Sequence, residues 1–220
     1  MFRMLTISVA AVSVATVASL SVANAEQGDW LVRARVIGVM PSEDAGAVEP
    51  AFPGGSVSVE DAWVPELDFT YFVTDRLGLE LILATSPHDI TGEGDLSALG
   101  TVADTMALPP TLTLQYHFNP AGKLRPYAGV GLNYTTFYSE DASSSLEDAI
   151  GATSISLDDS FGLAVQAGVD LDLNETWFLN ADVKYIDIDT TADLNTGGAI
   201  NSVDVDLDPV VAGIGIGRRF

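Results

Sequence analysis

The residues that could perform covalent or metal chemistry are few. Cysteine is absent from the 220 residues, so the chain holds no thiolate nucleophile and no cysteine-ligated metal cluster. The two histidines are His88 and His117. Ser86 and His88 have the residue types of a nucleophilic pair, but two positions on a strand without a third orienting group form a weak dyad. With no H-E-x-x-H, G-x-S-x-G or P-loop pattern, we expect no enzyme, no cofactor and no metal site.

A second set of candidates consists of charged side chains inside segments that alternate between apolar and polar positions. They are Arg33, Arg35 and Lys184 against Glu66, Asp68, Glu80, Asp170 and Asp182. If the polar positions face the inside of a closed barrel, these opposite charges meet there. We expect them to pair as a structural network that plugs the interior. A selective path for protons or ions is the alternative.

The overall composition combines two properties that are uncommon together. Hydrophobic residues make up 47% of the chain and the mean hydropathy is +0.27, yet the formal net charge is −22. The acidity excludes a nucleic-acid-binding protein, which needs a basic surface against phosphates. The apolar content excludes an acidic disordered chain. The spacing of the apolar residues must decide among the classes that remain.

The first 25 residues have the pattern of an export signal. Arg3 precedes an apolar run from Leu5 to Val22, and Ala23-Asn24-Ala25 supplies the small residues that a signal peptidase accepts. A transmembrane anchor is the alternative, but acidic rather than basic residues follow the run. We therefore expect a cleaved signal peptide at 1–25 and a mature domain at 26–220. Because Arg3 is the one charge removed, the mature net charge is −23.

The mature chain alternates with a period of two in many segments, which predicts long strands with two different faces. Short connections alternate with long segments rich in Gly, Ser, Asp and Ala, as in outer-membrane barrels. We therefore predict an all-β fold, an eight-stranded antiparallel transmembrane β-barrel with short periplasmic turns and long extracellular loops. The expected strands are 30–40, 62–73, 77–87, 109–118, 125–138, 158–173, 177–189 and 203–220, and the long loops are 41–61, 88–108, 139–157 and 190–202.

The outward and inward faces of these strands lead to different predictions. The outward face is apolar and carries aromatic residues near strand ends, which is typical of interfacial girdles. The inward face carries apolar residues mostly toward the loop end, so we expect an apolar vestibule above a polar, charged base. Packing of the interior is the alternative role for these residues. They are Ile37, Val39, Phe72, Ile82, Phe137, Val205 and Leu207. The acidic loop residues form a solvated surface, with divalent-cation binding as an alternative.

Almost the whole mature chain resembles the OmpW family of small outer-membrane proteins. The resemblance rests on Leu67-Asp68-Phe69-Thr70-Tyr71-Phe72-Val73-Thr74-Asp75, on Arg125-Pro126-Tyr127-Ala128-Gly129-Val130-Gly131 and on Leu207-Asp208-Pro209. Asp159-Ser160-Phe161-Gly162 and Tyr185-Ile186-Asp187-Ile188-Asp189 also belong to it. The carboxyl-terminal Phe220 resembles the mark by which the barrel-assembly machinery accepts its clients.

The resemblance implies a barrel in the cell outer membrane with a passage for small hydrophobic molecules. It suggests Ile82 as a constriction residue, facing an aromatic on the seventh strand, where this chain has Lys184. The implied partners are outer-membrane lipid, lipopolysaccharide, the assembly machinery and small hydrophobic solutes. A structural or adhesive barrel without transport is the alternative, and a lipid-modifying enzyme is a more distant one.

Overall fold

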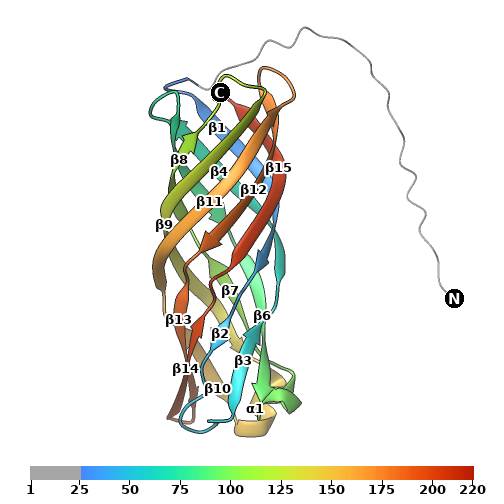
Figure 1. Cartoon of the computed structure of the whole chain (residues 1–220). Coiled ribbons are helices and arrows are strands. Elements are labelled where there is room, and N and C mark those ends of the chain that lie inside the picture. The colour runs from blue at the N-terminus through green and yellow to red at the C-terminus, as the bar shows by residue number, and fades with distance from the viewer. Residues whose placement is uncertain (1–25) are drawn as a thin grey trace, which may run out of the picture.

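The structure is a computed structural model that describes residues 26–220. The predicted signal peptide at 1–25 lies outside the described residues. The described chain is almost entirely strand, with one short helix, α1 (Ser144–Ile150), and one 3-10 turn, η1 (Ser97–Leu99). No helix in this part of the chain is long and apolar enough to cross a membrane. The strands form one tall tube, with α1 at the end opposite the carboxyl terminus (Figure 1).

The wall of the tube is a closed antiparallel ring of eight strands, as the sequence predicts. Around the ring each strand pairs with the next, and β15 returns to β1. In ring order the strands are β1 (Trp30–Met40), β4 (Ala62–Phe72), β5 (Leu77–Ala84), β8 (Thr111–His117), β9 (Leu124–Ala142), β11 (Ser160–Asp172), β12 (Trp177–Ile186) and β15 (Val210–Arg219). The connections 73–76, 118–123 and 173–176 at one end are short.

The long segments at the other end are largely strands rather than the predicted loops. They contain β2 (Asp44–Ala45), β3 (Gly55–Val59), β6 (Ser86–Gly94), β7 (Thr101–Leu108), β10 (Thr153–Leu157), β13 (Asp189–Thr196) and β14 (Ala199–Asp206). β13 and β14 pair without interruption from Asp189 opposite Asp206 to Thr196 opposite Ala199. Their Asp and Asn residues are depleted from ordinary strands, and their Ala residues to a lesser degree, so the composition indicated loops. The barrel wall therefore continues beyond its apolar band.

The outer surface of the ring carries most of the large apolar side chains, and a group of charged side chains lies inside. Trp63 is 75% exposed and Phe161 70% exposed, whereas Arg33 and Asp68 are fully buried. Exposed aromatic residues gather near the strand ends, as predicted: Trp30, Tyr71, Tyr116, Phe118 and Trp177 near the short turns, and Trp63, Tyr134, Tyr138 and Tyr185 toward the other end. This distribution is the reverse of a soluble protein and suits a wall that faces lipid.

Arg218 departs from the apolar pattern of the outer wall. Its guanidinium carbon lies 4.6 Å from the centre of the Phe220 ring and 5.6 Å from that of Trp177. These cation–π contacts hold the charge at the level of the aromatic residues near the short turns. An arginine at such an interface can reach the lipid head groups, so its cost to the barrel is small.

Candidate functional site

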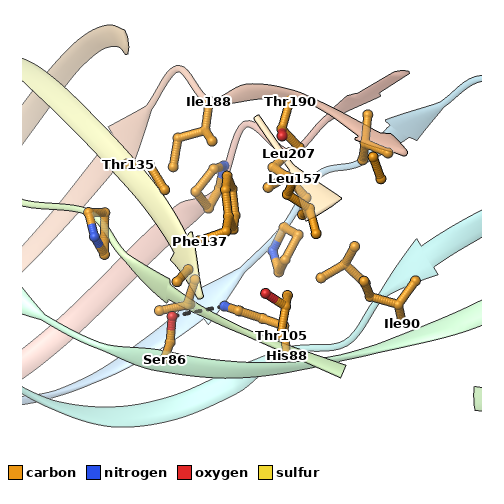
Figure 2. A pocket seen from close by; sticks show the side chains of 18 of the residues that line it. Ser86, His88, Ile90, Thr105, Thr135, Phe137, Leu157, Ile188, Thr190 and Leu207 are labelled. Atoms are coloured by element: carbon orange, nitrogen blue, oxygen red, sulfur yellow. Dashed lines mark hydrogen bonds between the residues drawn. The ribbon is translucent and has the colours of Figure 1, made fainter. Parts of the chain in front are cut away.

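The half of the barrel interior away from the short turns contains a large apolar cavity. Its volume is about 1220 Å³, which includes the part open to solvent. Side chains from most of the strands converge on it, and Figure 2 labels those from β6, β7, β9, β10 and β13 among them. Seven of the eight predicted channel residues line it: Ile37, Val39, Ile82, Phe137, Lys184, Val205 and Leu207. The cavity occupies the place at which the sequence predicts a vestibule.

Phe72 is the exception, because it does not line the cavity. It does face inward and is fully buried, but it ends β4 beside the short turns. There it packs against Leu31 and Phe178, and its ring centre lies 4.8 Å from that of His117. Alternation gives the face of a residue, whereas its height depends on where the strand begins and ends. Phe72 therefore belongs to the closed end of the barrel.

Between these two levels lies a network of buried ion pairs centred on Arg33. Its Nη1 atom lies 2.9 Å from Asp68 Oδ1 and 3.4 Å from Glu80 Oε1, and its Nη2 atom lies 3.1 Å from Asp170 Oδ2. The same Nη1 donates to the Thr70 hydroxyl at 2.8 Å. One guanidinium thus joins β1 to β4, β5 and β11 across the interior. All the charged partners are fully buried, so each depends on the others for compensation.

Arg35 and Lys184 extend the network toward the cavity. Arg35 places its guanidinium nitrogens 2.7 Å from Glu66 Oε1, 2.7 Å from Asp68 Oδ2 and 2.9 Å from Asp182 Oδ2. Lys184 Nζ donates to Glu66 Oε1 at 3.0 Å and to Asp182 Oδ2 at 2.8 Å. Because Lys184 and Glu66 also line the cavity, this ion pair forms its boundary with the charged layer.

Part of the network, near the short turns, was not predicted from the sequence. Arg125 is fully buried, contacts Asp172 and lies 3.7 Å from Asp170 Oδ2. Gln166 donates to Glu80 at 2.5 Å, and Asn180 donates to Asp170 at 2.8 Å. The inward phase of the predicted strands could have identified all four. The term charge network is used below for ten residues: Arg33, Arg35, Arg125, Lys184, Glu66, Asp68, Glu80, Asp170, Asp172 and Asp182.

The two histidines lie in opposite halves of the barrel. His117 Nε2 donates a hydrogen bond to Gln115 Oε1 at 3.1 Å, and its ring stacks on Tyr127 beside the charge network. His88 lines the cavity on β6, where Ser86 Oγ lies 2.9 Å from Nε2 and the Glu60 carbonyl lies 3.1 Å from Nδ1. The third group that orients His88 is thus a backbone carbonyl, which sequence patterns do not reveal.

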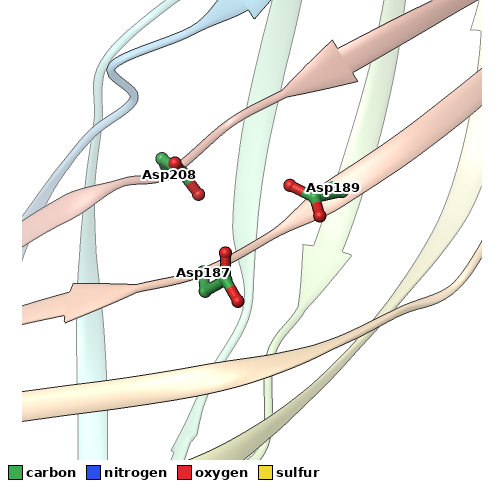
Figure 3. Close-up of side chains that lie close together, drawn as sticks. All are labelled: Asp187, Asp189 and Asp208. Carbon is green, nitrogen blue, oxygen red and sulfur yellow. The ribbon is translucent and has the colours of Figure 1, made fainter.

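Three carboxylates gather on the outside of the wall where β12 passes into β13. Their oxygens, from Asp187, Asp189 and Asp208, all lie within 4.8 Å of one another (Figure 3). Asp208 accepts hydrogen bonds from the Tyr185 hydroxyl at 2.8 Å and from the Ile188 amide at 3.3 Å. Like charges this close repel one another, and these two hydrogen bonds offset part of that repulsion at Asp208.

Comparison with known proteins gives consistent matches over nearly the whole described chain. A model of the OmpW family matches residues 26–220. Outer membrane protein W of Escherichia coli (strain K12) is 40% identical over 215 residues, covering 97% of this chain and 99% of that protein. The dibenzothiophene metabolism operon protein PahQ of Pseudomonas aeruginosa is 34% identical over 170 residues, 76% of each chain. The crystal structure of the outer membrane protein OprG from Pseudomonas aeruginosa superimposes with a TM-score of 0.83 at 36% identity, covering 90% of this chain and 98% of that one.

Replacing Arg33 by Met should lower the free energy of unfolding by about 3–5 kcal/mol, because Asp68, Glu80 and Asp170 lose their shared guanidinium. Urea titration of the barrel in lipid, followed by tryptophan fluorescence, measures this change. Arg76→Met is the matched control, since Arg76 is exposed at a short turn and donates to the Tyr116 hydroxyl. The control should cost less than about 1 kcal/mol. Equal losses in the two variants would contradict the central place of Arg33.

His88 should titrate at a lower pH than an exposed histidine. β6 carries Pro87, Asp89 and Thr91 on its outer face, so it lies beyond the lipid-facing band. Burial lowers the pKa of His88. The Glu60 carbonyl and the carboxylates of Asp61 and Asp89 act in the opposite direction without cancelling the effect of burial.

Nuclear magnetic resonance of the ring nitrogens measures this titration and identifies the neutral tautomer with the proton on Nδ1. Ser86→Ala should raise the midpoint, because neutral His88 then loses the hydrogen bond that Ser86 donates to it. A midpoint at or above that of an exposed histidine in the unsubstituted barrel would refute the prediction.

Proposed function

The chain belongs to the OmpW family of outer-membrane proteins, and we propose that its barrel provides a passage for small hydrophobic molecules. The single observation that carries the proposal is the apolar cavity in the half of the barrel away from the short turns. Apolar concave pockets are the usual binding sites of small organic ligands. An apolar solute leaves water on entering, which favours uptake from the outer surface.

The charge network supports an uncharged solute. A small ion that moved along the barrel axis would have to enter a layer in which every charge already has a partner and no side chain is exposed. Taking an ion out of water costs several kcal/mol unless a partner compensates it. Charged solutes are therefore disfavoured at this layer by the free-energy cost of leaving water, whereas apolar solutes are favoured in the cavity above it.

Ile82 is the proposed constriction residue, and Lys184 the proposed boundary. Ile82 is 3% exposed and lies opposite Asp68 on β4 and Thr111 on β8, so it stands directly above the charged layer. Lys184 takes the place of the expected aromatic and is held by Glu66 and Asp182. A solute at the base of the cavity would therefore meet one apolar side chain and one neutralised ion pair.

The relatives support the same reading. PahQ carries dibenzothiophene metabolism in its name, and dibenzothiophene is an apolar aromatic compound. Outer membrane protein W of Escherichia coli and OprG of Pseudomonas aeruginosa are named as outer-membrane proteins. A structural or adhesive barrel without transport is the alternative that an uptake measurement separates from this proposal.

The partners remain proposals. Lipid faces the apolar band, and lipopolysaccharide is the proposed neighbour of the acidic segments at the far end of the tube. Phe220 is the proposed assembly signal. Its ring is exposed, and its backbone exchanges hydrogen bonds with Trp30 at 2.9 and 3.2 Å. The Phe220 side chain therefore stays accessible, while its backbone hydrogen bonds join the end of the last strand to the first strand.

Ile82→Asp should reduce uptake of n-nonane at least about tenfold, because an unpaired carboxylate at the base of the cavity costs more than 1.4 kcal/mol to desolvate. The measurement is the initial rate of nonane uptake by a Gram-negative host that lacks related barrels and keeps full-length lipopolysaccharide. Ile82→Val, which keeps an apolar side chain, is the matched control and should stay within about twofold of the unsubstituted barrel.

Nonanoate, which has the same chain length and a charge, tests the selectivity. A barrel that raises nonanoate uptake more than nonane uptake would overturn the hydrophobic passage. No increase for either solute over cells without the barrel would favour the structural or adhesive alternative. Unchanged nonane uptake in Ile82→Asp would remove Ile82 from the constriction.

A further inference from the structure

One wall of the cavity carries a small group of polar side chains, Ser86, His88 and Thr105, which we call the polar corner. Ser86 and His88 are two positions apart on β6, so both face inward. His88 lies opposite Thr105 on β7. Figure 2 shows the three side chains on the same wall, opposite the apolar side chains of Leu157, Ile188 and Leu207. All three polar residues are buried and line the cavity.

The hydrogen bonds of His88 fix the direction of the bond from Ser86. The Glu60 carbonyl, 3.1 Å from Nδ1, can only accept, so Nδ1 carries the ring proton. Since burial keeps His88 neutral, Nε2 has no proton and accepts from the Ser86 hydroxyl at 2.9 Å. The Ser86 hydroxyl therefore donates its hydrogen bond to His88, and its oxygen can still accept a hydrogen bond from another group.

Thr105 is the member of the polar corner whose hydroxyl makes no hydrogen bond with the described residues. Its Oγ1 is buried and has no partner among the described residues, although the side chain is 6% exposed and lines the cavity. Every other polar side chain on the described cavity wall has a partner. Thr111 donates to Pro109, Thr135 to Asn133, Thr190 to Asp158 and Lys184 to Glu66.

A buried hydroxyl without a partner costs about 1–3 kcal/mol, so it gains when a ligand supplies the missing group. Rotation about χ1 to the next staggered position can bring the hydroxyl group to the place of the methyl group, while the methyl group moves to the place of the Cβ hydrogen. A ligand oxygen that reaches Thr105 can therefore draw the hydroxyl toward itself. Nothing comparable is available to a hydrocarbon, which has no hydrogen-bonding group.

We propose that the polar corner is a recognition subsite for a neutral apolar molecule that carries one carbonyl or hydroxyl oxygen, such as a medium-chain ketone or alcohol. Thr105 donates to that oxygen, and Ser86 can accept from a hydroxyl. The hydrocarbon part lies against the apolar wall. The proposal rests on the proposed passage and makes it selective for oxygenated over plain hydrocarbons.

The charges around the cavity favour a neutral ligand over a carboxylate. In the charge network the carboxylates outnumber the cations, and Glu66, which lines the cavity, belongs to it. The Lys184 ammonium is already shared between Glu66 and Asp182. Neutral His88 offers a carboxylate no charge to pair with. A carbonyl or hydroxyl oxygen needs only the single hydrogen bond that Thr105 can give.

The test compares 2-nonanone with n-nonane in the host cells described above. The quantity measured is the ratio of the two initial uptake rates, each corrected for cells without the barrel. Thr105→Val removes the hydroxyl with almost no change of shape and should lower this ratio roughly threefold to tenfold, the worth of one hydrogen bond. Thr105→Ser keeps the hydroxyl and should preserve the ratio. Thr91→Val is the matched control on β6, since Thr91 does not line the cavity.

The outcomes separate this inference from the proposed function. If nonane uptake depends on the barrel but Thr105→Val leaves the ketone ratio unchanged, the subsite is wrong and the passage stands. If the barrel raises uptake of neither solute, the passage itself fails. A fall of the ratio in Thr91→Val as large as in Thr105→Val would also overturn the subsite, because the loss would not depend on the cavity.

A spectroscopic measurement tests the hydrogen bond without relying on uptake. The barrel in lipid nanodiscs is mixed with 2-nonanone labelled with ¹³C at the carbonyl carbon, and the carbonyl resonance is recorded. We expect a second, downfield resonance for ketone bound to the unsubstituted barrel and to Thr105→Ser, and its loss in Thr105→Val. A single resonance identical in all three samples would refute the subsite.

Discussion

Closure of the strand ring is the constraint on which the rest of this structure depends. A wall surrounded by lipid has no water to satisfy its backbone, so each strand must pair on both edges and β15 must return to β1. Once the ring is closed, alternate side chains face lipid or the interior. Apolar residues are then stable outside, and whatever the narrow interior holds must find partners within it. The charge network and the apolar cavity are two solutions to that second requirement.

The two solutions differ in what they permit. Near the short turns the interior is filled by ions that compensate one another, and glycine makes room for the largest side chains. A Cβ atom at Gly217 would overlap the Phe178 ring, and one at Gly168 would overlap Tyr127. Toward the other end, Ala, Val and Ile leave space that ions do not fill. The interior is closed by charged residues at one end and is apolar at the other, so the two ends of the barrel are chemically different.

Much of this could be predicted from the sequence, because a period of two assigns both the wall and the inward face. The pairing of Arg33 with Asp68 and of Arg35 with Glu66 follows from the register of β1 and β4. The height of Phe72 does not follow from alternation, but the predicted strand 62–73 and the short connection after it already place Phe72 at the short-turn end. Strands β13 and β14 could not be predicted because their polar composition is typical of loops. The contact between His88 and the Glu60 carbonyl could not be predicted either, because the carbonyl belongs to the backbone and does not depend on the residue type.

The strands beyond the apolar band also determine where the barrel opens. Eight residues of β13 span about 26 Å along the strand, and a strand tilted as in most barrels rises about 20 Å. The mouth therefore stands beyond the apolar band on strands of two hydrogen-bonded sheets rather than on loops. The opening of the cavity is therefore built from paired strands, whose backbone hydrogen bonds hold its shape.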